Sequence, residues 1–304
     1  MSKFKAAGED AGKRLDVFLA ENIPDQSRSA IQKLIKNGSV QYAGKIVKSP
    51  KTPVAEGHTA EISIPEKIEN PLPQPEDISL DIIYEDDDIM VINKTPDMVV
   101  HPAPGAEKGT VVNALLAHIA NFADKFDDKS RPGIVHRLDK ETSGCLLIAK
   151  DQITLERLIS FFKRHKIKKT YIALVSGHLK KKKATISKNI GRHPGNRKKM
   201  AIVNDGGKEA VTHYEVINEL IIDNRPVSYL KIDLETGRTH QIRVHLASIH
   251  HPVLGDKIYG GNQKLEFPRQ MLHAWKLKIT HPTTRDEREF TAPIPDNWEG
   301  WAEE

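Results

Sequence analysis

The 304-residue sequence predicts an α+β fold, in which a small αβ domain precedes a larger domain built on a mostly antiparallel mixed β-sheet flanked by helices. Three observations support this prediction. The chain is long enough for about two domains, each with its own core. Many short strand-like segments accompany only a few helix-like ones, which is typical of α+β architecture. Residues 230–235 alternate between apolar and charged side chains, which indicates a sheet with one solvated face.

The predicted small domain covers residues 1–65. Helices are expected over residues 12–23, which Pro24 ends, and from residue 25 to a stop at Gly38, a segment that opens with Asp and Ser residues that can cap a helix. Two short strands are expected over residues 39–47 and around residues 59–65. The domain also carries four basic residues that are candidate RNA contacts: Arg14, Arg28, Lys33 and Lys36.

A linker and the larger domain follow. Residues 66–79 are acidic and rich in proline, which predicts an extended linker. The larger domain then covers residues 80–304. Helices are expected within it over residues 110–122 and 151–166, because apolar side chains recur there at helical spacing. Segments read as strands are residues 169–178, 213–220 and 227–237.

The composition, 38% apolar and 29% charged, is that of a soluble globular protein. No apolar run approaches the roughly 18 residues of a membrane span, and the first residues lack the apolar core of a signal peptide. The single cysteine, Cys145, excludes an internal disulfide and favours a reducing, cytoplasmic location. Cys145 opens an apolar segment, so we expect it to pack as a small hydrophobic residue.

Charge is distributed unevenly along the chain. The net charge is only +5, but residues 163–199 hold fourteen Lys and Arg and no acid. Residues 66–88 hold nine acids and one lysine. Although charge runs are usually solvated surface, a basic block without acids inside a folded domain indicates a polyanionic partner. Nucleic acid is favoured over a membrane, because no basic amphipathic helix is present.

A charged turn lies directly before the apolar segment 145–150. In this turn, "GIVHRLDKETSG" (residues 133–144), Asp139 is flanked by Arg137 and Lys140. The simplest interpretation is a solvated surface turn. The alternative is an acid positioned for chemistry on an anionic substrate.

A second informative stretch is "LETGRTHQIRVHLASIHHP" (residues 234–252). A turn at Gly237 leads to Thr239, a candidate helix cap, and a short helix should follow with its apolar residues on one face. Counting round that helix places His240 and Arg243 on a common face. Arg243 should therefore project near the end of a strand, where a carboxylate could meet it.

Several site classes find no support in the sequence. His240 and His245 lie about 140° apart round a helix, so they do not form an adjacent pair of metal ligands, and no metal is expected. Phosphate-loop and dinucleotide-binding fingerprints are absent, as is a serine nucleophile elbow. Taken alone, Asp139 would be a turn or salt-bridge residue, Tyr171 a core residue, and Arg243 a surface or phosphate contact.

Taken together, these segments resemble the RluA-type RNA pseudouridine synthases. "HRLDKETSG" is similar to that family's signature, except that Glu141 and Cys145 stand where Asp and Leu are expected. Residues 1–65 resemble the RNA-binding domain shared with ribosomal protein S-four, a layout similar to the RluD-like subgroup. Other matching segments are "MVVHPAPG", "KKTYIALVSGH", "GRTHQIRVHLASIHHPVLGDKIYG", "LHAWKLKITHP" and, in the small domain, "RLDVFLAENIPDQSRSAIQKLIKNGSV".

The resemblance implies the pseudouridine synthase fold and gives roles to three residues. Asp139 would be the catalytic aspartate, Tyr171 the active-site tyrosine, and Arg243 the partner that holds Asp139 ionised and oriented. Whether Asp139 attacks the anomeric carbon or deprotonates the sugar stays open. The residues expected to contact RNA in the larger domain are Arg137, Lys140, Arg238 and His240.

The expected function is therefore isomerisation of specific uridines to pseudouridine in structured RNA. Large-subunit (23S) ribosomal RNA, free or in an assembling subunit, is the favoured substrate. Two alternatives remain: the same chemistry on transfer RNA, and a non-catalytic RNA-binding or ribosome-assembly factor. The reaction needs no cofactor or metal, and we expect a monomeric cytoplasmic protein without a membrane partner.

Overall fold

The computed structural model describes residues 2–64, 72–103, 105–196, 199–261, 267–298 and 301. The chain divides into two compact units, residues 1–70 and 71–304. The described residues include no helix that is both long enough and apolar enough to cross a membrane. Each unit has its own apolar core, and each is considered by itself below.

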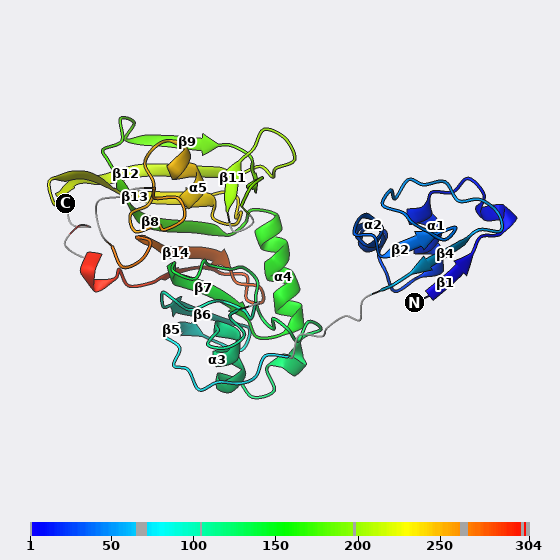
Figure 1. Cartoon of the computed structure of the whole chain (residues 1–304). Coiled ribbons are helices and arrows are strands. Elements are labelled where there is room, and N and C mark those ends of the chain that lie inside the picture. The colour runs from blue at the N-terminus through cyan, green and yellow to red at the C-terminus, as the bar shows by residue number, and fades with distance from the viewer. Residues whose placement is uncertain are drawn as a thin grey trace. The chain divides into compact units, whose positions relative to one another are not determined.

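The N-terminal unit packs two helices on a four-stranded antiparallel sheet (Figure 1). Ser27 caps the second helix by accepting a hydrogen bond from the Ala30 backbone N–H, and that helix ends before Gly38, whose φ is +80°. The strand order is β1-β4-β2-β3. The elements are β1 (Ser2–Lys5), a 3₁₀ turn (Gly8–Asp10), α1 (Leu15–Asn22), α2 (Arg28–Lys36), β2 (Val40–Tyr42), β3 (Lys45–Ile46) and β4 (Thr59–Ile62).

Strand β1 was not expected from the sequence. Its four residues carry mostly exposed, charged side chains, so they show no clear apolar alternation. The strand is defined instead by backbone pairing, in which Ser2 to Lys5 run antiparallel to β4. Backbone pairing of this kind leaves no signal in the side-chain pattern.

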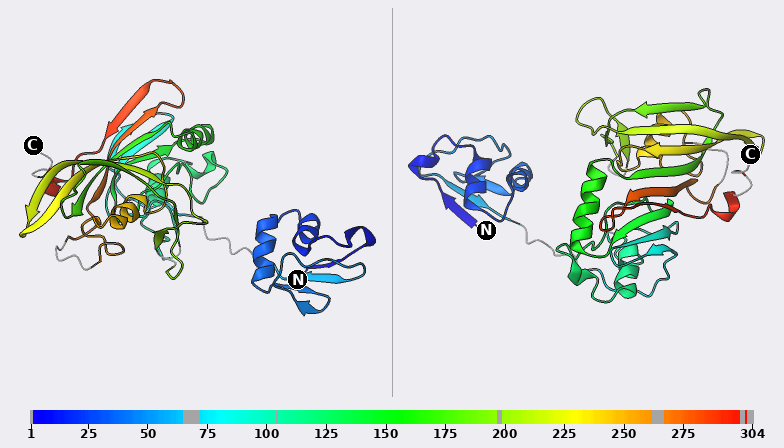
Figure 2. Two further views of the ribbon diagram at one scale, coloured as in Figure 1. Left: turned by 90° about the horizontal axis from the view of Figure 1, so that it is seen from above. Right: turned by 180° about the vertical axis from the view of Figure 1, so that it is seen from behind.

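The large unit is organised around a nine-stranded sheet with the order β5-β6-β7-β14-β8-β13-β12-β9, and β15 pairs with β14 (Figures 1 and 2). The sheet strands are β5 (Ile82–Glu85), β6 (Ile89–Lys94), β7 (Ser143–Ala149), β8 (Lys168–Ser176), β9 (Lys183–Ser187), β12 (Val211–Ile222), β13 (Arg225–Leu234), β14 (Leu272–Thr280) and β15 (Glu287–Thr291). A separate ribbon joins β10 (Ile190–Arg192) and β11 (Met200–Ile202). The helices are α3 (Val111–His118), α4 (Gln152–Lys163) and α5 (Gln241–Ser248), with 3₁₀ turns at Ala123–Lys125 and Asp296–Trp298.

Strand β14 closes the centre of this sheet, although it comes late in the sequence. It pairs antiparallel with β8 and parallel with β7, whereas the other pairs in the sheet are antiparallel. At the parallel contact Ala274 lies opposite Gly144, whose φ is +109°. A Cβ at Gly144 would stand 2.2 Å from the Ala274 carbonyl oxygen, so only glycine allows this approach.

Both faces of the central strands are covered. On β8, Tyr171 and Ala173 pack into the main core, while Ile172 and Leu174 point to the opposite face and pack near Trp298. The two helices expected from apolar spacing are present as α3 and α4, capped by Thr110 and Asp151. Cys145 is buried in the main core, and burial raises the pKa of its thiol to about 12.

The start of α5 differs from the expectation. Thr239 does not cap this helix, because the N-cap residue is His240, which has a left-handed backbone (φ 56°) and makes no side-chain capping bond. The side chain of Gln241 performs the related task, since its Oε1 accepts hydrogen bonds from the Arg238 N–H and the Thr236 hydroxyl. Because Gln241 is the first residue inside the helix, the pattern of capping residues did not predict its part in ordering the helix start.

Candidate active site

The charged turn expected from the sequence forms a loop at the start of β7. Within it the Thr142 N–H donates to the Asp139 carbonyl, which closes a tight turn just before the buried strand. The Asp139 side chain is 18% exposed and reaches toward α5. This places a carboxylate at the mouth of the core rather than on open surface.

Arg243 lies between two aspartates. Its Nη1 donates to Asp139 Oδ2 at 2.7 Å, while Nε and Nη2 donate to the two Asp256 oxygens at 2.7 and 3.0 Å. The guanidinium is 5% exposed, and burial alone would lower its pKa, but the two carboxylates outweigh burial and raise it. Arg243 is therefore a permanent cation held in a fixed orientation against Asp139.

Asp256 is the residue that fixes Arg243. Its side chain is fully buried, and Oδ1 also accepts the backbone N–H groups of Ile258 and Tyr259 at 2.8 and 3.0 Å. Burial raises the pKa of the Asp256 carboxyl, but the bonds from Arg243 and from these amides outweigh burial and leave it lowered. Asp256 is thus ionised and saturated, while Asp139 keeps an open side.

His240 approaches the other oxygen of Asp139. Tyr259 accepts the Met200 N–H at 2.8 Å and shares a 2.8 Å hydrogen bond with His240 Nδ1. The Tyr259 hydroxyl donates to Nδ1 in one imidazole tautomer and accepts from it in the other. Nε2 lies 3.9 Å from Asp139 Oδ1. Burial, outweighing the attraction of Asp139, lowers the pKa of His240.

These groups surround a small cavity of about 60 Å³. Tyr171 forms part of its wall from β8, and it is 8% exposed. Burial, reinforced by the negative charge of Asp139, raises the pKa of the Tyr171 hydroxyl, which stays protonated at neutral pH. Six residues singled out in the sequence line this one cavity: Arg137, Asp139, Tyr171, Arg238, His240 and Arg243.

Lys94 anchors the loop that carries Asp139. It ends β6, is 1% exposed, and its ammonium donates to the carbonyls of Thr95, Met98 and Lys140 at 2.7, 2.9 and 3.0 Å. Burial, with repulsion from Arg269, lowers the pKa of Lys94 to about 7. Three carbonyl acceptors match the three N–H bonds of an ammonium group, so the charged form fits this position. The bond to Lys140 fixes the residue after Asp139.

The remaining sequence-predicted contacts lie elsewhere. The Lys140 side chain is exposed and is absent from the lining of the cavity, while its carbonyl faces Lys94. In the N-terminal unit Arg14 and Arg28 both pair with the fully buried Asp16, at 2.9 and 3.0 Å, and keep 39% and 50% of their side chains exposed. The other two predicted contacts in that unit, Lys33 and Lys36, are exposed on α2.

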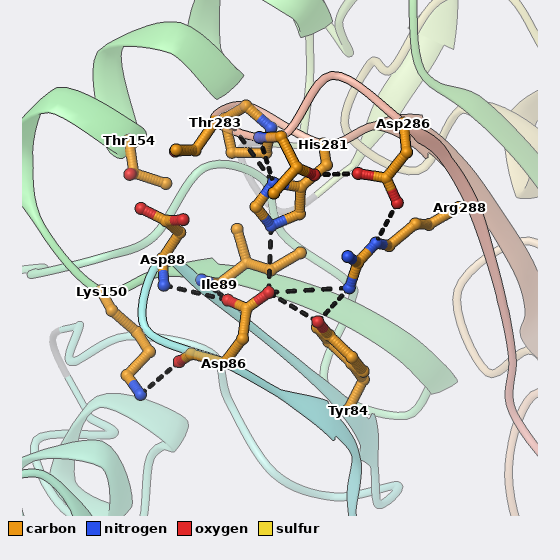
Figure 3. A network of polar contacts seen from close by, with 12 residues as sticks. Tyr84, Asp86, Asp88, Ile89, Lys150, Thr154, His281, Thr283, Asp286 and Arg288 are labelled. Carbon is orange, nitrogen blue, oxygen red and sulfur yellow. Dashed lines mark hydrogen bonds and ion pairs between the residues drawn. The ribbon is translucent and has the colours of Figure 1, made fainter.

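One cluster away from this cavity has the composition of a metal site. In the described part of the chain, Asp86, Asp88 and His281 bring three potential ligand atoms within 4.8 Å of one another (Figure 3). However, His281 Nδ1 accepts the N–H groups of Thr283 and Thr284, and Nε2 lies 3.0 Å from Asp86 Oδ2. Both ring nitrogens are therefore used, and the cluster joins the β5–β6 turn to the end of β14.

Three residues of the site were not singled out in the sequence: Asp256, Tyr259 and Lys94. Asp256 and Tyr259 stand in the segment "GDKIYG" (residues 255–260), and its spacing from Arg243 did not show that the chain folds back on that residue. Lys94 closes the apolar run "IMVIN", and a lysine there predicts a buried ammonium that needs carbonyl acceptors.

Comparison with known proteins places this geometry in a family. The model of the RNA pseudouridylate synthase family matches residues 88–248, and that of the S4 domain matches residues 13–59. An uncharacterized RNA pseudouridine synthase of Synechocystis sp. is 43% identical, with 95% of this chain and 88% of that protein aligned. Ribosomal large subunit pseudouridine synthase D of Escherichia coli (strain K12) is 43% identical, covering 94% of this chain and 88% of its own.

A solved structure with an RNA pseudouridylate synthase domain is also similar to this chain. Human RNA pseudouridylate synthase domain containing 1 matches with a TM-score of 0.58 and 32% identity, over 71% of this chain and 84% of that one. The site around Asp139 lies within the part of the chain that the family model covers. The chain therefore belongs to the RNA pseudouridylate synthase family, with an S4 domain as its N-terminal unit.

Proposed function

We propose that this RNA pseudouridine synthase isomerises uridines of large-subunit ribosomal RNA, and that Asp139 carries the chemistry. The observation that supports the catalytic role is the Arg243 bridge: one oxygen of Asp139 is held at 2.7 Å by a cation whose other donors are fixed by buried Asp256. The substrate proposal is supported by the name of the Escherichia coli relative, which is 43% identical.

In the proposed reaction the bond between N1 of uracil and C1′ of ribose breaks, and a bond between C5 and C1′ forms. The proton on C5 is lost and N1 gains a proton, so no oxidant or reductant is consumed. Asp139 either attacks C1′ or removes a proton from the sugar; both routes begin from the carboxylate. Arg243 donates to one oxygen of Asp139, and the His240 ring lies 3.9 Å from the other, which limits rotation of the carboxylate.

Tyr171 is proposed to hold the detached uracil. It is a neutral phenol in the cavity wall, so its ring can stack on the base while its hydroxyl offers a hydrogen bond. A protonated hydroxyl cannot itself remove the C5 proton. A part for Tyr171 in that final step therefore requires the proton to pass through its hydroxyl to another group, such as Asp139.

RNA binding is proposed for both units. The target uridine is buried in folded RNA and must be flipped out to reach a cavity of this kind. Arg137, Arg238 and His240 line that cavity and would meet the flipped nucleotide, while Lys140 lies on the surface beside it. The S4 domain would add affinity through Arg14, Arg28, Lys33 and Lys36.

Further parts of the proposal concern organisation. We propose a functional boundary in which residues 1–65 bind RNA, residues 66–79 link, and residues 80–304 catalyse. Gln74 and Glu76 already hydrogen-bond to α3 and the loop before it, which supports treating the later part of the linker as attached to the catalytic unit. A cytoplasmic monomer acting on free or assembling subunit RNA completes the proposal.

The test is release of tritium from C5 of uridine in transcribed large-subunit ribosomal RNA. The wild type should release tritium at specific sites, whereas Asp139→Asn should lose at least about 1,000-fold in kcat and keep its RNA affinity within a few-fold. Tritium release from transfer RNA alone would show that the substrate is transfer RNA and not ribosomal RNA. Binding without any release by the wild type would favour a non-catalytic factor, and an active Asp139→Asn would remove Asp139 from the chemistry.

A further inference from the structure

A second cavity, of about 460 Å³, adjoins the catalytic one. Its other walls come from the end of α4 and from the loop between β13 and α5. A volume of this size is typical of sites that hold a small molecule or one unit of a polymer. The two cavities lie side by side, because Arg137, Asp139, Tyr171, Leu234 and Arg238 line both of them.

Lys169 forms part of the wall of this second cavity. It lies two residues before Tyr171 on β8, so both side chains leave the same face of the sheet. Its Nζ makes one long hydrogen bond, 3.4 Å from the Thr236 carbonyl, and lies 6.0 Å from the centre of the Phe162 ring. Within the described residues Lys169 forms no ion pair.

The contrast with Lys94 shows what Lys169 lacks. Lys94 is buried and donates to three carbonyls at 2.7 to 3.0 Å. Lys169 is half-buried and has a single weak acceptor in the described part of the protein. A partly desolvated cation with one weak acceptor gains more from an incoming anion than a cation whose donors are all used.

The surroundings of Lys169 also favour an anion. Its two nearby acids are already engaged: Asp139 pairs with Arg243, and Glu235 lies 2.7 Å from His213. Arg238 uses its Nε on the Glu209 carbonyl at 2.8 Å. The titratable groups that line the cavity with Lys169 are His136, Arg137, Asp139, Lys163, His165, Tyr171, Glu235 and Arg238.

We propose that Lys169 and Arg238 form a subsite for a phosphodiester of the nucleotide next to the target uridine. The inference rests on the proposed function, because it takes RNA as the substrate. A nucleotide seated in the catalytic cavity has a phosphate on each side, and the second cavity is the adjacent space. The subsite would position the strand and take no part in bond breaking.

The titration of Lys169 gives the subsite a signature. Burial, with repulsion from Arg238, lowers the pKa of Lys169 to about 8. A bound phosphate favours the ammonium form and raises that pKa again. Above pH 8 Lys169 is largely deprotonated in the free protein, so the protein should take up a proton when it binds RNA. The affinity of the wild type should therefore fall as pH rises from 8 to 9.

The experiment measures tritium release and filter-binding affinity on transcribed large-subunit ribosomal RNA for three variants. Lys169→Met should raise KM about 10-fold and keep kcat within about 2-fold. The slope of the logarithm of RNA affinity against the logarithm of salt concentration should become shallower by about one, because one phosphate contact is lost. Lys168→Met is the matched control, because Lys168 is the adjacent lysine on the opposite face of β8, and it should change KM by less than about 2-fold. Lys169→Arg should keep its affinity and lose the decline above pH 8.

The outcomes separate the inference from the proposed function. Equal KM values for the Met variants at positions 168 and 169, or a pH decline that survives in Lys169→Arg, would overturn the subsite. A fall in kcat with KM unchanged would also overturn it, since that result assigns Lys169 to the chemistry or the fold. If the wild type bound the RNA but released no tritium, the proposed function would fail, and the affinity and pH measurements would still decide the subsite.

Discussion

Each unit of the chain contains a fully buried aspartate that gathers cationic side chains, and the two clusters differ in where the cation points. In the N-terminal unit Asp16 accepts bonds from Arg14, Arg28 and Gln32, and the two arginines extend outward, 39% and 50% exposed. In the catalytic unit Asp256 holds a single arginine that is 5% exposed.

The difference shows two uses of the same pairing. Asp16 tethers arginines that remain in water, where they can meet phosphates along a surface. Asp256 directs one guanidinium inward at Asp139, whose carboxylate keeps a free side. The same ion pair can therefore hold a cation at the surface or direct it at a second carboxylate, depending on how far the cation is withdrawn from water.

The largest expected effect comes from removing the inner anchor. Asp256→Asn leaves the buried Arg243 with one partly exposed carboxylate, so the free energy of unfolding of the catalytic unit should fall by about 3–5 kcal/mol. Urea unfolding followed by tryptophan fluorescence measures this unit alone, since all three tryptophans lie in residues 71–304. Asp139→Asn is the control and should cost less than about 1 kcal/mol. Equal losses of unfolding free energy in the two variants would show that Asp256 contributes no more to the stability of the fold than Asp139.

Asp16→Asn should have a smaller effect, confined to the N-terminal unit. Its arginines stay hydrated when the carboxylate is lost, so we expect a loss of about 1–3 kcal/mol. Circular dichroism should detect the earlier unfolding of this unit, while the tryptophan transition stays in place. A shift of the tryptophan transition instead would mean that the two units do not unfold independently.

Acid should weaken the N-terminal cluster in a defined range. Burial alone would raise the pKa of Asp16, but the bonds from Arg14, Gln32 and Arg28 lower it to about 2 from 3.8. A lowered carboxyl pKa stabilises the fold above pH 3.8, and this stabilisation is lost as pH falls from 3.8 toward 2. Thermal melting of the N-terminal unit between pH 5 and pH 2 checks the range. In Asp16→Asn this pH dependence should be reduced.

The smallest effect concerns one outer arginine. Arg28→Lys keeps the charge and loses the planar guanidinium, so stability should change by about 0.5 kcal/mol. Affinity for the transcribed ribosomal RNA should fall a few-fold, with kcat unchanged. Gln32→Ala removes a neutral donor to the same carboxylate and serves as the comparison. If both variants bound RNA equally to the wild type, the exposed guanidinium would have no role at the RNA surface.

The sequence predicted the parts of the site that carry an identifiable signature. Asp139 and Arg243 were expected to meet, and they lie 2.7 Å apart. Asp256 was not expected, because nothing in the spacing of an acid 13 residues after an arginine shows that the chain folds back on it. Lys94 was missed for the same reason: its acceptors are backbone carbonyls, and Lys140 lies 46 residues away.

The fold, like the site, could be predicted only in part. Helices α3 and α4 follow from apolar spacing and capping residues, which act over a few positions. The place of β14 in the sheet does not follow from such local signals, because its partners β7 and β8 precede it by about a hundred residues or more. Side-chain alternation reports that a strand has two faces but not which strands lie beside it.

The central place of β14 has a consequence for synthesis of the protein. While the chain is being made, β5–β7 and β8–β13 emerge as two separate part-sheets, and Leu272–Thr280, which joins them, is synthesised after both. Gly144, which follows the loop that carries Asp139, lies against this later strand. A nascent or truncated chain that lacks it would hold most of the cavity's residues without their common scaffold. The cavity can therefore form only after residues 272–280 have been synthesised.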